Sequence, residues 1–208
     1  MISYAICTHN EQNSYISPLL DKLIKFKQPE DEIVLLDDFS DNIDTVDCLN
    51  KYRDQITIKY HALDNDFAAH KNFLNSLCKG EYIVQLDADE SMHEVLIRML
   101  PELFTMNPSV DLFTIARINI VPNITQEDIL RWGWRMNDKM WLNFPDRQTR
   151  IYKNKPNIVW EGRVHERIVG FDTHSELPDS AVEYCLFHMK SLERQKVQNE
   201  LYSKMSNH

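Results

Sequence analysis

A mostly parallel, doubly wound α/β sheet is the fold that this sequence predicts. Short aliphatic runs alternate with segments of helical periodicity up to about residue 118, which is the pattern of successive βαβ units. The run at 33–36 is continuously apolar, as expected for a strand that helices cover on both faces. Polar and acidic residues follow three of the runs, at the strand ends where an open α/β sheet binds its ligands.

Local signals place the elements of this alternation. The segment 14–26 carries apolar residues at the spacing of one helix face, and Pro29 lies just beyond its end. Lys79-Gly80 closes the helix at 67–78 as a typical C-cap pair. The expected strands are 2–7, 33–36, 56–60, 82–86 and 112–118, and the expected helices are 14–26, 41–52, 67–78 and 94–106.

The pattern changes after residue 118. Residues 120–145 are irregular and rich in Trp, Arg and Asn. Short strands are expected at 149–152, 163–169 and 181–188, and a terminal helix is expected at 191–205. The sequence therefore predicts one domain with two halves, a regular α/β half at 1–118 and a smaller mixed half at 119–208.

Composition excludes several classes of function. The 208 residues carry a formal net charge of -9, so strong binding to nucleic acid is not expected. The four glycines form neither a dinucleotide fingerprint nor a P-loop. We expect neither a membrane-spanning stretch nor a signal peptide. The four cysteines have no paired spacing, so we expect reduced thiols in a cytoplasmic protein.

The most informative motif is Asp87-Ala88-Asp89, which directly follows the apolar run at 82–86. Two carboxylates this close are costly to bury unless a cation or hydrogen-bond donors balance them. At the end of a strand the pair suits Mg²⁺ or Mn²⁺, which prefer oxygen ligands and often also hold substrate phosphates. A solvated acidic loop is the alternative. Polar clusters at 8–11 and 37–41 follow two other strands, so we expect a polar pocket at one sheet edge.

Taken in order, the motifs resemble those of the family 2 glycosyltransferases, which are inverting enzymes with the GT-A fold. The resemblance runs from Ile2 to about His188, and its later motifs look like those of a bacterial or viral subgroup that acts on cell-surface glycans. Phe39 is a departure, because the family usually has a small residue there. The matching stretches are 2–11, 33–41, 66–72, 80–90, 147–154 and 160–166.

The resemblance implies a nucleotide-sugar donor, expected to be a UDP-sugar, and a Mn²⁺ or Mg²⁺ cofactor. Residues 1–118 would bind the donor and residues 119–208 the acceptor. Asp38 would accept a hydrogen bond from the uracil imide N–H, and Lys71 would lie near the ribose or diphosphate. Thr8 and Glu11 would border the nucleotide, Asp87 and Asp89 would hold the ribose and the metal, and His188 would complete the metal shell.

Each of these roles has a structural alternative. Asp38 could be a turn residue, Lys71 an exposed helix charge, and His188 a partly buried structural histidine. A non-catalytic nucleotide- or glycan-binding module of the same fold would explain the motifs without turnover. A sugar-phosphate nucleotidyltransferase shares a similar sheet, although it typically carries a glycine-rich loop that the segment 8–11 lacks.

An inverting transfer also needs a base that takes the proton of the attacking acceptor hydroxyl. Glu166, in the pair His165-Glu166, is the first candidate, because partial burial can adapt a carboxylate to this task. Asp89 is the second candidate, and Glu161 and Glu90 are further rivals. The expected acceptor is a glycan, a lipid-linked molecule or another hydroxyl compound, and the enzyme could act as a homo-oligomer.

The second half also gathers aromatic and basic side chains near its motifs. Indole rings can stack on sugars, although tryptophan is more often a core residue. Arginine recognises phosphate through paired hydrogen bonds. These candidates are Trp132, Trp134, Trp141, Trp160, Arg131, Arg135, Arg147 and Arg150.

Overall fold

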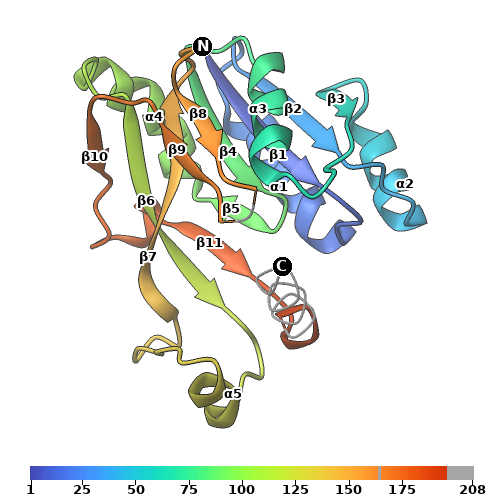
Figure 1. Cartoon of the computed structure of the whole chain (residues 1–208), viewed down its shortest axis with the longest axis vertical. Helices are drawn as coiled ribbons and strands as arrows, with labels where there is room; N and C mark the ends of the chain where they lie inside the picture. The colour runs from blue at the N-terminus through green and yellow to red at the C-terminus, as the bar shows by residue number, and fades with distance from the viewer. Residues whose placement is uncertain (164, 196–208) are drawn as a thin grey trace.

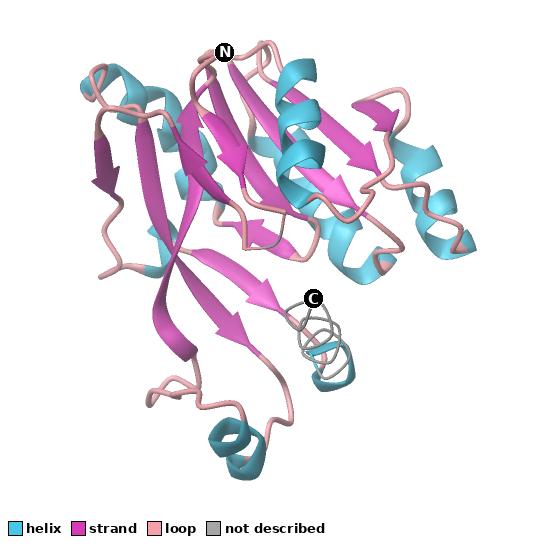
Figure 2. Ribbon diagram, in the orientation of Figure 1, coloured by secondary structure: helices cyan, strands magenta, loops and turns pink. Residues whose placement is uncertain are grey.

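The β-strands form a long mixed sheet that carries helices on both faces (Figures 1 and 2). The structure is a computed structural model that describes residues 1–163 and 165–195. The strands of the main sheet follow the order β3-β2-β1-β4-β7-β6-β11-β5, with β10 also paired to β6. A separate two-stranded sheet consists of β8 and β9.

The element bounds follow the expected alternation closely up to β6. The helices are α1 (Asn13–Phe26), α2 (Ile43–Tyr52), α3 (Phe67–Leu77), α4 (Glu94–Met106) and α5 (Gln126–Arg131), with a 3₁₀ turn at Val182–Tyr184. The strands are β1 (Ile2–Thr8), β2 (Glu32–Asp37), β3 (Thr57–Tyr60), β4 (Tyr82–Asp87), β5 (Glu90–Met92), β6 (Leu112–Ile120), β7 (Leu142–Lys153), β8 (Val159–Glu161), β9 (Arg167–Val169), β10 (His174–Glu176) and β11 (Leu186–Met189).

The first half of the sheet is parallel and doubly wound, as predicted. Strands β3, β2, β1 and β4 pair in parallel. Helices α1, α2 and α4 pack on one face, and α3 packs on the other face together with β8 and β9. The alternation of side chains along β1 explains this arrangement, because Tyr4 and Ile6 enter one core and Ala5 enters the other.

The second half differs from a simple continuation of the parallel sheet. Strand β7 lies between β4 and β6 and is antiparallel to both. We expected a strand only at 149–152, whereas β7 runs from Leu142 to Lys153. Its first part is only half-buried, so the apolar pattern used to find strands marks only the end that enters the core.

The remaining differences are β5, which was not expected, and short elements of residues 120–195. Within the expected irregular stretch, α5 begins at a capping box formed by Thr125 and Asp128. The strand expected at 163–169 is present only as β9, and the one expected at 181–188 becomes the 3₁₀ turn and β11. Of the terminal helix expected at 191–205, the structure describes helical residues only at 192–195. Within the described residues, no helix has the length and apolar character needed to cross a membrane.

Candidate active site

A cavity of about 710 Å³ opens at the carboxyl ends of the parallel strands. Thr8 at the end of β1 is paired in register with Asp37 on β2, and Cys7 is paired with Asp87 on β4. The three polar clusters that follow these strands therefore meet at one edge, as expected. Thr8, Glu11, Asp38, Asp87 and Asp89 all line the cavity.

The loop after β2 places Asp38 in the cavity wall. Asp37 is buried, and its carboxylate accepts hydrogen bonds from the backbone and the hydroxyl of Ser40. Phe39 between them has a φ of 47°, a left-handed conformation that glycine adopts more easily. This explains the small residue that the family pattern has there. Oδ1 of Asp38 accepts from the Leu63 N–H at 2.9 Å, whereas Oδ2 lies 3.7 Å from Nδ1 of the half-exposed His9.

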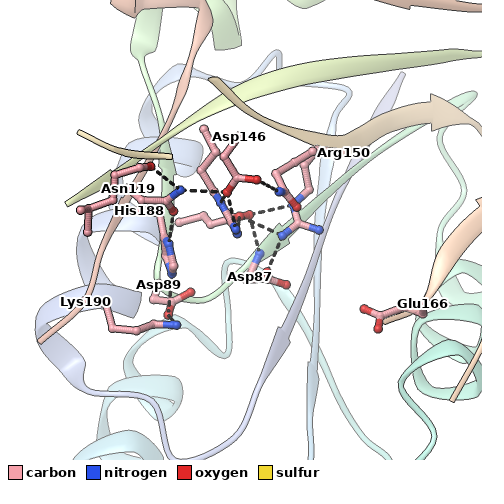
Figure 3. Close-up of polar contacts among 12 residues, drawn as sticks. Asp87, Asp89, Asn119, Asp146, Arg150, Glu166, His188 and Lys190 are labelled. Atoms are coloured by element: carbon pink, nitrogen blue, oxygen red, sulfur yellow. Dashed lines mark hydrogen bonds and ion pairs between the residues drawn. The ribbon is translucent and has the colours of Figure 1, made fainter. Parts of the chain in front are cut away.

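Asp89 and His188 lie at one side of the polar network in Figure 3, next to Lys190 and Asn119. His188 Nε2 lies 3.2 Å from Asp89 Oδ2, and both side chains are about nine-tenths buried. The strand pairing explains the contact, because β11 pairs with β5 and thereby brings His188 next to the loop after β4. Lys190 Nζ and an Arg194 nitrogen each lie 3.6 Å from the same oxygen.

The pKa of Asp89 is lowered by its surroundings. Burial on its own would raise it, but the hydrogen bond and positive charge of His188 outweigh burial. Lys190 and Arg194 act in the same direction. Asp89 is therefore held as a carboxylate.

Asp87 has different partners from Asp89. Arg150 on β7 donates to the Asp87 carboxylate and also to both oxygens of the buried Glu90. Arg117 on β6 donates to Glu90 as well. Among the described residues, no group of three or more His, Cys, Asp and Glu side chains is arranged around one metal position. Of the three expected metal ligands, only Asp89 and His188 lie together.

The pair Asp89 and His188 fits a divalent cation with two protein ligands. A carboxylate oxygen and an imidazole nitrogen face each other at 3.2 Å, and both are ligand types of divalent metal ions in proteins. A cation held by one carboxylate normally takes further ligands from water and substrate phosphates. The open cavity beside the pair leaves room for them.

Glu166 lies across the cavity from this network, beside the β8–β9 sheet (Figure 3). Its Oε1 is 2.6 Å from Nζ of Lys71, which lies on α3 and is buried. The Lys71 ammonium also sits 4.4 Å from the ring centre of Trp160. Lys71 thus lines the cavity, but in this structure it contacts Glu166. The rival base Glu161 is exposed and Glu90 is fully engaged inside the protein.

Two other residues that were expected to border the nucleotide also line the cavity. Thr8 lines the cavity wall, but its hydroxyl is buried and makes no hydrogen bond to the residues that the structure describes. Glu11 is buried and receives two hydrogen bonds from Arg194. Arg194 thereby ties the loop after β1 to the segment that follows β11.

The tryptophans divide between cavity and core. Trp134 lines the cavity, and it packs against Trp132 at a ring distance of 4.8 Å. Trp160 also borders the cavity, although its side chain belongs to the core and donates to Tyr152. Trp141 packs against Phe144, outside the cavity lining.

Sequence reasoning missed several cavity residues of the second half. Arg117 and Asn119 follow one another on the same face of β6, and Asp146 faces them from β7. Their alternation with buried Ala116 and Ile118 is a strand pattern that could have placed them on a polar face. No sequence motif marks Lys190 and Arg194. They reach the site only because β11 pairs with β5 and β6.

Comparison with known proteins assigns the family. The model of the family described as "Glycosyl transferase family 2" matches residues 3–194. The chain belongs to glycosyl transferase family 2. The match covers both halves of the sheet, including β7 and β11. No curated protein sequence matches the chain.

Solved structures with the same fold include TarS of S. aureus. This family 2 chain is similar to TarS 1-349 in complex with UDP-GlcNAc, at 18% identity and a TM-score of 0.59, over 91% of this chain and 58% of that chain. TarS 1-349 in complex with UDP is 18% identical with a TM-score of 0.56, and the match covers 93% of this chain and 62% of that chain. A third structure, described as S. aureus TarS, is 19% identical with a TM-score of 0.61, and the match covers 91% of this chain and 36% of that chain. The chain thus spans less than two thirds of each TarS structure, and the likeness establishes the GT-A fold.

Proposed function

We propose that this chain is a metal-dependent glycosyltransferase that moves a sugar from a UDP-sugar to an acceptor hydroxyl with inversion. Family membership and the fold shared with TarS, which was solved with UDP-GlcNAc and with UDP, support the donor class. The observation that carries the proposal is the buried pair of Asp89 and His188 at the carboxyl edge of the sheet. Four free cysteines support a reaction in the cytoplasm, where thiols stay reduced.

The residues of the cavity divide the chemistry between them. Asp89 and His188 would hold the cation, which when bound neutralises negative charge on the diphosphate leaving group. The acceptor oxygen attacks C1 of the sugar, and the bond between C1 and the phosphate oxygen breaks. The hydroxyl proton passes to the carboxylate of Glu166, and UDP leaves. A single displacement of this kind inverts the configuration at C1.

A panel of nucleotide sugars incubated with the protein and Mn²⁺ tests the proposal. We expect slow hydrolysis of one UDP-sugar in the absence of an acceptor, and this result would also name the donor. A protein that binds UDP-sugars but never hydrolyses or transfers them would instead be a binding module. A nucleotidyltransferase would release diphosphate from a nucleoside triphosphate and a sugar phosphate, and we expect no such release.

We expect UDP binding to require a divalent cation and to depend on Asp89. The Asp89→Asn variant keeps the shape of the side chain but removes the charge that balances His188, Lys190 and Arg194. Calorimetry should show tight UDP binding by the parent protein only with Mn²⁺, and weak binding by the variant. Asp44→Asn, an exposed change on α2, is the matched control. Equal binding of UDP by the parent with and without Mn²⁺ would contradict the metal-dependent site.

We expect uridine to be the preferred base, with Asp38 as the residue that reads it. Oδ1 of Asp38 is used by the Leu63 N–H, and Oδ2 can accept from the uracil imide. In a thermal-shift panel with Mn²⁺, UDP should stabilise the protein more than GDP or CDP. Asp38→Asn keeps an oxygen for Leu63 and should reduce this preference. A larger shift with GDP or CDP would count against the assignment.

A further inference from the structure

Asn119 lies directly behind His188 in the sheet. The two residues are opposite neighbours in the parallel pairing of β6 and β11. His188 Nδ1 is 2.7 Å from Oδ1 of Asn119, and its other ring nitrogen is the one that faces Asp89. Figure 3 shows the three side chains in this order, with Asp146 on the far side of Asn119.

The surroundings of Asn119 fix which way its amide points. Its Nδ2 lies 2.8 Å from Oδ2 of Asp146 and 3.4 Å from the backbone oxygen of Leu142. Both partners can only accept hydrogen bonds, so a flipped amide would place oxygen against oxygen. The amide oxygen must therefore face His188.

Asp146 is itself held in place. Arg117 donates to Oδ2 of Asp146 at 2.9 Å, and Gln148 donates to Oδ1 at 2.7 Å. The pKa of Asp146 is lowered, because Arg117 and the hydrogen bond from Asn119 outweigh the effect of burial, which would raise it. The carboxylate that orients Asn119 is thus permanently an acceptor near neutral pH.

We propose that Asn119 is a positioning residue that keeps the proton of the His188 ring on Nδ1, so that Nε2 and Asp89 together offer lone pairs to a divalent cation. The hydrogen bond made by one ring nitrogen decides which tautomer a histidine adopts, and an oxygen acceptor at Nδ1 requires the proton there. A cation bound at Nε2 would take the place of the hydrogen bond between this nitrogen and Asp89 Oδ2, which lie 3.2 Å apart, while the proton on Nδ1 stays with Asn119. Outer contacts of this kind orient metal ligands.

The inference rests on the proposed function for the identity of the cation, but the tautomer can be tested without any cation. Long-range ¹H–¹⁵N NMR of the His188 ring in the metal-free parent protein at pH 8 should show a proton on Nδ1. An unprotonated Nδ1 would overturn the inference. Since this measurement needs no variant, it holds even if a substitution prevents folding.

Cation affinity provides the second test. Mn²⁺ titrated into the protein with UDP present should bind Asn119→Ala about 10–100-fold more weakly than the parent. In a His188→Ala background the same change should cost almost nothing further, because Asn119 acts through His188. Asp44→Asn, the exposed change on α2, is the control, and its Mn²⁺ affinity should match the parent.

The outcomes separate the two proposals. A parent protein with Nδ1 protonated but no Mn²⁺-dependent UDP binding would defeat the metal-dependent function and leave the tautomer assignment standing. An equal loss for Asn119→Ala in both backgrounds would show a merely structural role and would overturn the inference. Unchanged Mn²⁺ affinity in Asn119→Ala would overturn it as well.

Discussion

Glu166→Gln is expected to slow sugar transfer by about 10²–10⁴-fold, the usual contribution of general-base assistance. The amide keeps the size of the side chain and an oxygen for Lys71, which lies 2.6 Å away, but it cannot take the acceptor proton. Initial rates of transfer, measured with the UDP-sugar that the donor panel identifies, provide the test. UDP affinity in the presence of Mn²⁺ should stay close to that of the parent.

Glu161→Gln is the matched control for this prediction. Glu161 lies on β8, close to Glu166 in the sequence, but it is exposed and does not line the cavity. Its variant should transfer sugar at the parental rate. Full activity of Glu166→Gln would pass the base role to Asp89, and a loss of UDP affinity would instead place Glu166 in the donor site.

Arg150→Ala is expected to lower the free energy of unfolding by about 3–5 kcal/mol, the usual cost of removing one partner of a buried ion pair. Arg150 donates to both oxygens of Glu90, whose side chain is completely buried. Its loss leaves this buried carboxylate with fewer hydrogen-bond donors. Urea unfolding followed by circular dichroism measures the change.

Arg147→Ala tests whether burial is the cause. Arg147 lies on the same strand and also pairs with two carboxylates, but these partners are open to solvent, with the side chains of Glu176 and Asp179 55% and 36% exposed. Exposed pairs contribute about 0–1 kcal/mol, so this variant should unfold nearly like the parent. The double variant Arg150→Met with Glu90→Leu should recover part of the loss, because it removes the buried carboxylate together with its arginine partner. Equal destabilisation by both arginine changes would refute the burial argument.

The donor half of the fold was predictable from local sequence. Buried aliphatic runs, helical spacing and caps lie within the segments they define, as α4 at Glu94–Met106 illustrates. The meeting of the polar clusters after β1, β2 and β4 could also be predicted, because neighbouring parallel strands end at the same edge of the sheet. Phe39 shows the limit of this reasoning, since its positive φ leaves no mark in a pattern of polarity.

The second half was less predictable because its contacts depend on strand pairing over long distances. Nothing near Leu142–Lys153 indicates that this segment inserts between β4 and β6. The same is true of the site. Asp87 and Asp89 stood out as a motif, but Arg150 reaches Asp87 and Asn119 reaches His188 only through pairings that the local sequence does not encode.

The central place of β7 also affects the order in which the sheet can be completed on the ribosome. Strand β4 emerges long before β7, and β6 emerges between them, so both edges that later flank β7 are at first without their partner. At about 5–20 residues per second, β4 waits roughly 3–13 s for the end of β7. Unpaired strand edges are sites of aggregation, so the nascent chain is most vulnerable in this interval.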